Sequence, residues 1–205
     1  MNSRPLGVVH VTLAPRTLPE AAAEAHRLGF DHIDVPAEWS GDLALPVGDR
    51  TAVPSPLSGC STPAPPEAPG MWDRAVRAYR RTPNIRVEPW GGSIVNSIEQ
   101  ARALVDEVPG LRLLVDTGHV ASWGEDPVEL LELAGHVQLR QARPGVVQAA
   151  VDDGDVDFAA VYRRLDELGY RGLISVEYFD LPEYGWPLAD PLGHAVALAE
   201  HVRRL

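Results

Sequence analysis

The sequence predicts an α/β protein in which parallel strands alternate with helices and close into a (β/α) barrel. Two observations predict this class. Residues 111–141 indicate a buried strand, a polar site loop, a helix and a second strand. Along the second half of the chain, strands recur that each end in an acidic or amide side chain. Repeated around a closed sheet, such βα units place their chemistry at the carboxyl ends of the strands.

Composition limits the class of protein and its partners. The chain has 205 residues, 45% of them apolar, which is enough for one globular domain over residues 1–205. Its net charge of −11 disfavours nucleic acid, because an acidic surface repels phosphate. The single cysteine, Cys60, cannot form an intramolecular disulfide. No segment approaches the roughly 20 apolar residues of a membrane span, nor resembles a signal peptide. We therefore expect a cytoplasmic protein with no membrane partner.

The first 40 residues indicate two strands and a helix. Residues 7–13 are rich in β-branched side chains and carry His10. A Thr-x-x-Glu capping pattern begins a helix over residues 17–28. Residues 31–35 form a second predicted strand, which carries His32. Either histidine could be a ligand or a base, but a single histidine in a strand is more often a core or surface residue.

Residues 42–70 interrupt this pattern. Seven prolines among these 29 residues exclude a helix. An irregular segment of this length is unusual inside a compact domain, so it is either a lid over the site or the remnant of βα units lost by deletion. Residues 44–53 leave room for one more irregular strand, and residues 71–80 indicate a short helix.

From residue 84 onward the alternation is regular. The expected strands are residues 84–90, 111–115, 135–140 and 173–176, and the expected helices are residues 93–108, 127–133, 158–169 and 190–202. The last helix suits either closure of the barrel or a homodimer face. Five aromatic residues lie in predicted loops after strands, where they could flank a small substrate: Trp39, Trp90, Trp123, Tyr178 and Trp186.

Four successive strands end in a candidate donor, namely Glu88, Asp116, Gln138 and Glu177. They are 28, 22 and 39 residues apart, about one βα unit each, so a parallel barrel brings all four to one rim. Three carboxylates placed together raise one another's pKa unless a cation neutralises them. An oxygen-rich donor set favours Mg²⁺ or Mn²⁺, with Co²⁺ or Zn²⁺ as alternatives. The other interpretation is that Glu88 and Glu177 are surface caps and that Asp116 is structural.

Several segments together resemble the xylose isomerase-like TIM barrel superfamily, which includes sugar isomerases and epimerases, sugar dehydratases and enzymes of the endonuclease IV type. These segments are RVEPW, VDTGH, HVQLR, DDGDVDF and LDELGYRGLISVEY. The resemblance covers residues 84–180 well and the first 40 loosely. It implies an eight-stranded TIM-type barrel whose metal is held by Glu88, Asp116, Gln138 and Glu177. It also implies that His119 is the substrate-facing histidine of an Asp-x-x-His motif.

The sequence departs from the family in two ways. Gln138 stands where the family usually has histidine, although some dehydroshikimate-dehydratase-like members have glutamine there. His136 lies two residues earlier, about 6.6 Å deeper along the strand axis, and is not expected to replace it. We therefore expect a weaker, oxygen-only metal site. The chain is also short for the family, and residues 42–70 hold the shortfall, so the barrel should be trimmed or irregular around its third and fourth βα units.

The resemblance implies a divalent-metal-dependent isomerase or epimerase that acts on a small sugar-like hydroxy-ketone through an enediolate. Glu88 or Glu177 would move the proton, and His119 would hold a substrate hydroxyl or relay its proton. Arg140 could neutralise a carboxylate or orient a hydroxyl. The alternative is a dehydratase or lyase of the dehydroshikimate or inosose type, and a further alternative is a barrel that binds a ligand or partner without catalysis. A nuclease is disfavoured, because His119 alone among the seven histidines falls on a motif position.

Overall fold

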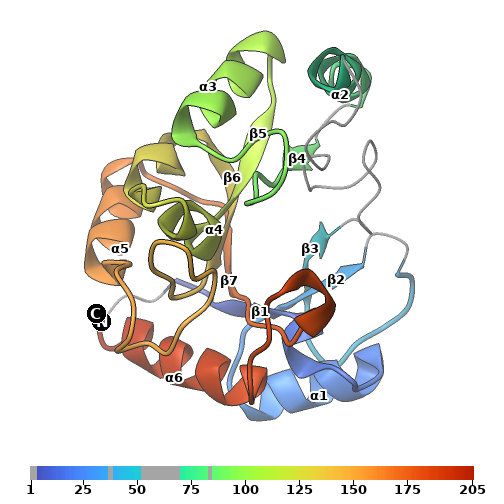
Figure 1. The fold of residues 1–205 in the computed structure, drawn as a ribbon. Helices are drawn as coiled ribbons and strands as arrows, with labels where there is room; N and C mark the ends of the chain where they lie inside the picture. The colour runs from blue at the N-terminus through green and yellow to red at the C-terminus, as the bar shows by residue number, and fades with distance from the viewer. Residues whose placement is uncertain (1–3, 37–38, 52–69, 83–84) are drawn as a thin grey trace.

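A computed structural model describes residues 4–36, 39–51, 70–82 and 85–205. Within these ranges, seven parallel strands form one sheet in the order β3-β2-β1-β7-β6-β5-β4. Their bounds are β1 Gly7–Val9, β2 Ile33–Pro36, β3 Val47–Thr51, β4 Arg86–Val87, β5 Arg112–Asp116, β6 Ala134–Leu139 and β7 Leu173–Val176. The sheet curls into a partial barrel (Figure 1). Its two ends are β3 and β4, the part of the chain in which the sequence predicts a trimmed barrel.

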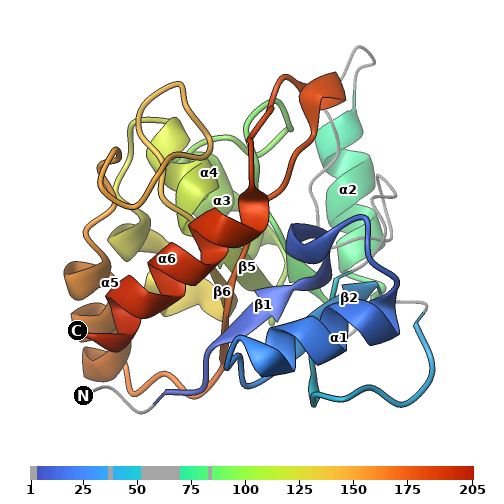
Figure 2. The ribbon, with the colours of Figure 1, turned by 90° about the horizontal axis from the view of Figure 1, so that it is seen from below.

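Helices cover the outer side of the curled sheet (Figures 1 and 2). The α-helices are α1 Leu18–Arg27, α2 Met71–Tyr79, α3 Ile98–Glu107, α4 Thr117–Ser122, α5 Phe158–Glu167 and α6 Pro191–Arg203, and the 3-10 helices are η1 His10–Leu13, η2 Pro127–Leu133 and η3 Pro182–Tyr184. Side-chain caps explain several starts. Thr17 and Glu20 form the predicted capping box of α1, and Asp157 caps α5. None of the helices in the described ranges is long and apolar enough to cross a membrane.

Strand register brings the site to one rim. Asp116 of β5 lies opposite Gln138 of β6, which lies opposite Ser175 of β7. Buried apolar side chains such as Leu113, at 0% exposure, fill the space between strands and helices. Glu88, Asp116, Arg140 and Glu177 all follow or end their strands, so they gather at the carboxyl edge of the sheet.

Two expected strands are shorter than predicted. Residues 10–13 form η1 instead of continuing β1, and Thr12 there accepts a hydrogen bond from the Tyr178 backbone at 3.0 Å. This contact ties the turn to the end of β7. β4 covers only Arg86–Val87, because Pro89 has no N–H to donate to a strand ladder.

Three helical predictions also need correction. α3 begins at residue 98 and not at 93, because Ser97 caps it by accepting from the Gln100 backbone N–H. The site loop after Asp116 is the short helix α4, capped by Asp116 itself. The helix at residues 127–133 is a 3-10 helix, and its carbonyls at 129 and 132 accept hydrogen bonds from two arginines of other elements.

In the first half of the chain, the structure describes one predicted strand and one predicted helix, but not most of the Pro-rich segment. β3 is the additional strand expected in residues 44–53, and α2 is the helix expected at 71–80. Cys60 and most of the Pro-rich segment 42–70 lie outside the described residues.

Candidate active site

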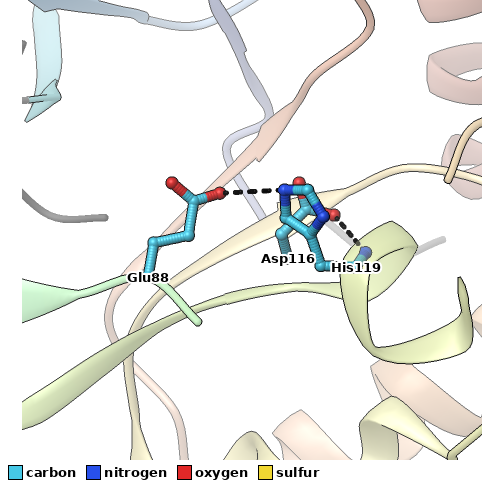
Figure 3. Close-up of side chains that lie close together, drawn as sticks. All are labelled: Glu88, Asp116 and His119. Carbon is cyan, nitrogen blue, oxygen red and sulfur yellow. Dashed lines mark hydrogen bonds and ion pairs between the residues drawn. The ribbon is translucent and has the colours of Figure 1, made fainter. Parts of the chain in front are cut away.

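Three of the predicted residues converge at the carboxyl rim. Atoms of Glu88, Asp116 and His119 that could bind a metal all lie within 4.8 Å of one another. Nε2 of His119 is 3.7 Å from Oε1 of Glu88. Figure 3 shows Glu88 reaching from the end of β4 toward the His119 imidazole, which overlaps the Asp116 side chain in this view. Three side chains that are far apart in the sequence therefore form one compact cluster.

Local hydrogen bonds fix the Asp116 end of this cluster. Oδ1 of Asp116 accepts from the backbone N–H groups of Gly118 at 2.7 Å and His119 at 3.3 Å. The carboxylate thus caps α4, and the first turn of that helix carries His119 over it. Thr117 anchors the same turn to the end of β6, because its hydroxyl donates to the Arg140 carbonyl and accepts from the Arg140 N–H, both at 2.9 Å.

Arg140 supplies the positive charge of the site in this structure. It is fully buried, at 0% exposure. Its guanidinium donates to Oδ2 of Asp116, and a second donor is 3.4 Å from Oε2 of Glu177. The Phe179 ring covers one face of the guanidinium, with Cζ 4.4 Å from the ring centroid. Arg140 therefore joins two of the predicted metal ligands.

Gln138 and His136 share a strand but have different surroundings. Gln138 is 1% exposed, and its Oε1 has no hydrogen-bond partner within the described ranges. A buried, unpartnered amide oxygen is costly unless something binds it. His136 lies deeper, where its Nε2 is 3.0 Å from Oδ2 of the fully buried Asp34. His136 thus faces a second carboxylate and not the cluster at the rim.

Burial controls the protonation of the site. Desolvation raises the pKa of Glu177 well above its ordinary value; Arg140 opposes this, and the charges of Glu88 and Asp116 add to it. Desolvation, together with the positive charge of Arg140, lowers the pKa of His119 from 6.5 to about 3, and the charge of Asp116 opposes this shift only in part. His119 is therefore a neutral imidazole at neutral pH.

A divalent cation suits this donor set. Asp116 and Glu177 share a single arginine, and burial of Glu177 makes its negative charge costly. The buried Oε1 of Gln138 offers one more oxygen, and the neutral His119 adds no opposing charge. The residues present thus fit an oxygen-rich site for a hard cation.

An aromatic wall borders the cluster, and its packing could not be predicted from sequence. The Trp186 ring centroid is 5.7 Å from that of His119, 5.7 Å from that of Phe179 and 6.0 Å from that of Trp90. The amide of Gln148 donates to the carbonyls of Phe179 and Trp186, at 2.8 and 3.1 Å, and holds this loop. Trp90 and Trp186 were expected near the site from their positions after strands. Phe179 and Gln148 carried no sequence signal.

Comparisons with known proteins agree on the fold. A family model described as xylose isomerase-like TIM barrel matches residues 70–204. The inosose dehydratase of Clostridium botulinum (strain Eklund 17B / Type B) is 27% identical over 135 residues, which cover 55% of this chain and 44% of that protein. The inosose dehydratase of Klebsiella pneumoniae (strain 342) is 26% identical over 192 residues, covering 76% and 62%. The chain therefore spans less than two thirds of the length of these relatives.

Solved structures of sugar epimerases superpose over nearly the whole chain. The 3-keto-D-glucoside 4-epimerase of E. coli gives a TM-score of 0.73 at 15% identity, covering 99% of this chain and 100% of that one. The D-allulose 3-epimerase of Methylomonas sp., in complex with D-allulose, gives 0.71 at 18% identity, covering 98% and 96%. At these identities the similarity establishes the barrel fold.

Proposed function

Because the chain belongs to the xylose isomerase-like TIM barrel family, we propose that it is a divalent-metal-dependent isomerase or epimerase of a small, carbohydrate-like hydroxy-ketone. One observation carries the proposal. The carboxylates of Glu88 and Asp116 present oxygens within 4.8 Å of each other at the rim where barrel enzymes perform their chemistry, and the His119 ring lies within the same distance of both. Glu177 stands beside them, linked through Arg140.

The metal ligands in this proposal are Glu88, Asp116, Gln138 and Glu177, with Mg²⁺ or Mn²⁺ favoured over Co²⁺ or Zn²⁺ because every donor is an oxygen. When bound, such a cation acts as a Lewis acid that polarises a carbonyl and acidifies the neighbouring C–H. The unpartnered Oε1 of Gln138 supports its inclusion in this set.

Glu177 and Glu88 are the candidates for proton transfer. One carboxylate removes the proton from the carbon beside the carbonyl, which leaves an enediolate, and the other returns a proton to the neighbouring carbon or to the opposite face. Burial raises the pKa of Glu177 toward the working pH of an acid–base residue. The Glu88 side chain is 13% exposed and lies 3.7 Å from His119.

His119 and the aromatic wall would position the substrate. As a neutral imidazole, His119 can donate one hydrogen bond to a substrate hydroxyl or accept one from it. Trp186 packs beside it and limits access of water to the reacting carbons. Water exclusion strengthens each charged contact in the cluster.

Solvent deuterium exchange tests this function. The protein is incubated with Mg²⁺ in D₂O with D-fructose, D-allulose or the keto-sugar acid 5-keto-D-gluconate, and proton NMR follows the hydrogens beside each carbonyl. We expect metal-dependent loss of one of these signals with at least one compound. Glu177→Gln should abolish the exchange, whereas Glu200→Gln, which changes an exposed carboxylate on α6, should leave it unchanged. Mg²⁺ binding without exchange for any compound would contradict catalysis and favour a binding barrel.

A dehydratase is the second candidate, because the curated relatives reported above are inosose dehydratases. Both reactions begin with the same proton abstraction, but the lyase then expels the β-hydroxyl as water. The same incubation, repeated with an inosose, distinguishes them. A new unsaturated carbonyl absorbance together with loss of the hydroxylated carbon would assign the lyase reaction.

A further inference from the structure

Arg140 contacts Asp116 and Glu177, two of the carboxylates proposed to bind the metal. We infer that Arg140 is a carboxylate-binding subsite that becomes available when a divalent cation binds Asp116 and Glu177, so that the hydroxy-ketone substrate also carries a carboxylate. This inference rests on the proposed metal-dependent function and adds the substrate class.

The structure holds Arg140 firmly from several sides. Its backbone N–H and carbonyl are both bonded to the Thr117 hydroxyl at 2.9 Å. Phe179 covers one face of the guanidinium. Gly118 leaves room on another side, because a Cβ atom there would lie 2.6 Å from Nε of Arg140. A side chain fixed in this way is pre-organised, so little entropy is lost when a ligand binds it.

The hydrogen-bond donors of Arg140 are incompletely used. A guanidinium has five N–H donors in a planar fork. Nη2 donates to Oδ2 of Asp116, and the contact of Nη1 with Oε2 of Glu177 is long, at 3.4 Å. The Nε–H is buried and has no hydrogen-bond partner in the described part of the chain. Arg140 therefore makes fewer hydrogen bonds to these carboxylates than its donors allow, and one of them is long.

Metal binding would remove part of what Arg140 now contacts. A cation on Asp116 and Glu177 takes carboxylate lone pairs and cancels the negative charge that faces the guanidinium. A fully buried arginine without a counter-ion is unfavourable by several kcal/mol. A substrate hydroxyl would satisfy one donor but not the charge. A substrate carboxylate satisfies both, through the bidentate geometry that arginine favours.

This arrangement predicts positive coupling between metal and carboxylate. Each ligand should tighten the binding of the other by the same factor, which for coupled sites is typically about 5- to 150-fold. Lactate and 1,2-propanediol provide a matched pair of unreactive probes, because they differ only in carboxylate versus hydroxymethyl. Lactate also chelates Mn²⁺ weakly in solution, which acts against the expected tightening.

The test is calorimetric titration of the metal-free, full-length protein with Mn²⁺, alone, with saturating lactate, and with the same concentration of 1,2-propanediol. We expect lactate to lower the Mn²⁺ dissociation constant about 5- to 150-fold and 1,2-propanediol to leave it unchanged. Arg140→Gln should abolish the lactate effect. Arg140→Lys, which keeps the charge but loses the fork, should reduce it and provides the test if the glutamine variant does not fold.

Arg143→Gln is the matched control, because Arg143 is a half-exposed arginine of the same loop, paired with Asp153 at 2.6 Å. It should retain the full lactate effect. If Mn²⁺ binds the natural protein but lactate and 1,2-propanediol act alike, the carboxylate subsite is wrong and the metal site stands. If Mn²⁺ does not bind under any condition, both the subsite and the proposed function are wrong.

Discussion

Gly118→Ala tests whether Arg140 is packed against the start of α4. The new Cβ would lie 2.6 Å from Nε of Arg140, 3.0 Å from its Cβ and 2.8 Å from the backbone oxygen of Val147. Such distances are shorter than ordinary contacts, and neither neighbour is a flexible chain end. Both must therefore move if the methyl group is to fit.

The expected magnitude follows from two opposing effects. Replacing glycine by alanine inside a helix normally stabilises it by about 1 kcal/mol. Overpacking a buried site by one methyl group costs about 1–3 kcal/mol, and here it also displaces the arginine that neutralises Asp116. Because two of the new contacts would be shorter than 3.0 Å, we place the packing cost in the upper part of this range, at about 2–3 kcal/mol, which leaves a net destabilisation of roughly 1–2 kcal/mol.

Urea denaturation at equilibrium measures this difference, with Gly91→Ala as the control. A Cβ at Gly91 would meet Trp123 at 3.5 Å, which is an ordinary contact. Gly91→Ala should therefore be neutral or stabilise the protein by up to about 1 kcal/mol, through the unfolded state. A Gly118→Ala protein as stable as the natural one would refute the packing argument.

Three further predictions concern buried ionisable groups. Because burial and Arg140 lower the pKa of His119 to about 3, its ring resonances should not titrate between pH 8 and 5. In the unfolded chain this histidine is protonated near pH 6.5, so the protein should lose stability as the pH falls from 6.5 toward 3, and this pH dependence should be absent in His119→Gln. A ring titration near 6.5 in the folded protein would contradict this prediction. Glu177→Gln should raise the melting temperature of the metal-free protein at neutral pH, because a carboxyl group with a raised pKa costs stability as the pH rises above 4.5. The variant should also lose the increase in melting temperature that Mn²⁺ causes in the natural protein, and an unchanged increase would exclude Glu177 as a ligand. Asp34→Ala removes the carboxylate 3.0 Å from His136 inside the barrel and should cost about 3–5 kcal/mol in urea unfolding, whereas a loss below about 1 kcal/mol would show that the pair contributes little.

The trimmed barrel retains its candidate site because of strand order. β4, β5, β6, β7 and β1 are consecutive neighbours in the sheet, and every predicted site residue lies on or just after the first four of them. Closure between β3 and β4 is therefore not required to hold Glu88, Asp116 and Glu177 together. The gap in the barrel borders β4, so Glu88 follows an end strand of the sheet.

Local sequence signals predicted the strands and most helices of the second half. Strand β7 has the predicted bounds, and Asp157 caps α5, because a continuous apolar run and an acidic cap are read from neighbouring residues. The start of α3 was wrong by five residues, since Ser93 and Ser97 both resemble caps and only the fold selects Ser97. Local patterns also could not predict that Thr12 would bond to the distant Tyr178.

The sequence predicts which rim residues lie close together, but not the contacts between them. Position after strands identified Glu88, Asp116 and Glu177, because parallel topology converts a sequence position into a place on the rim. That Arg140 would bind two of these carboxylates depends on side-chain packing across strands. The same holds for the Phe179 ring over the guanidinium, which no spacing in the sequence indicates.

The metal content of protein purified without chelator tests the central claim most directly. The natural protein is compared with a variant that carries Asp116→Asn and Glu177→Gln, each checked for folding by circular dichroism. The account predicts near-stoichiometric divalent metal in the natural protein and none in the variant. A natural protein without metal, whose melting temperature is unchanged by Mn²⁺, Mg²⁺, Co²⁺ or Zn²⁺, would contradict the metal-dependent function.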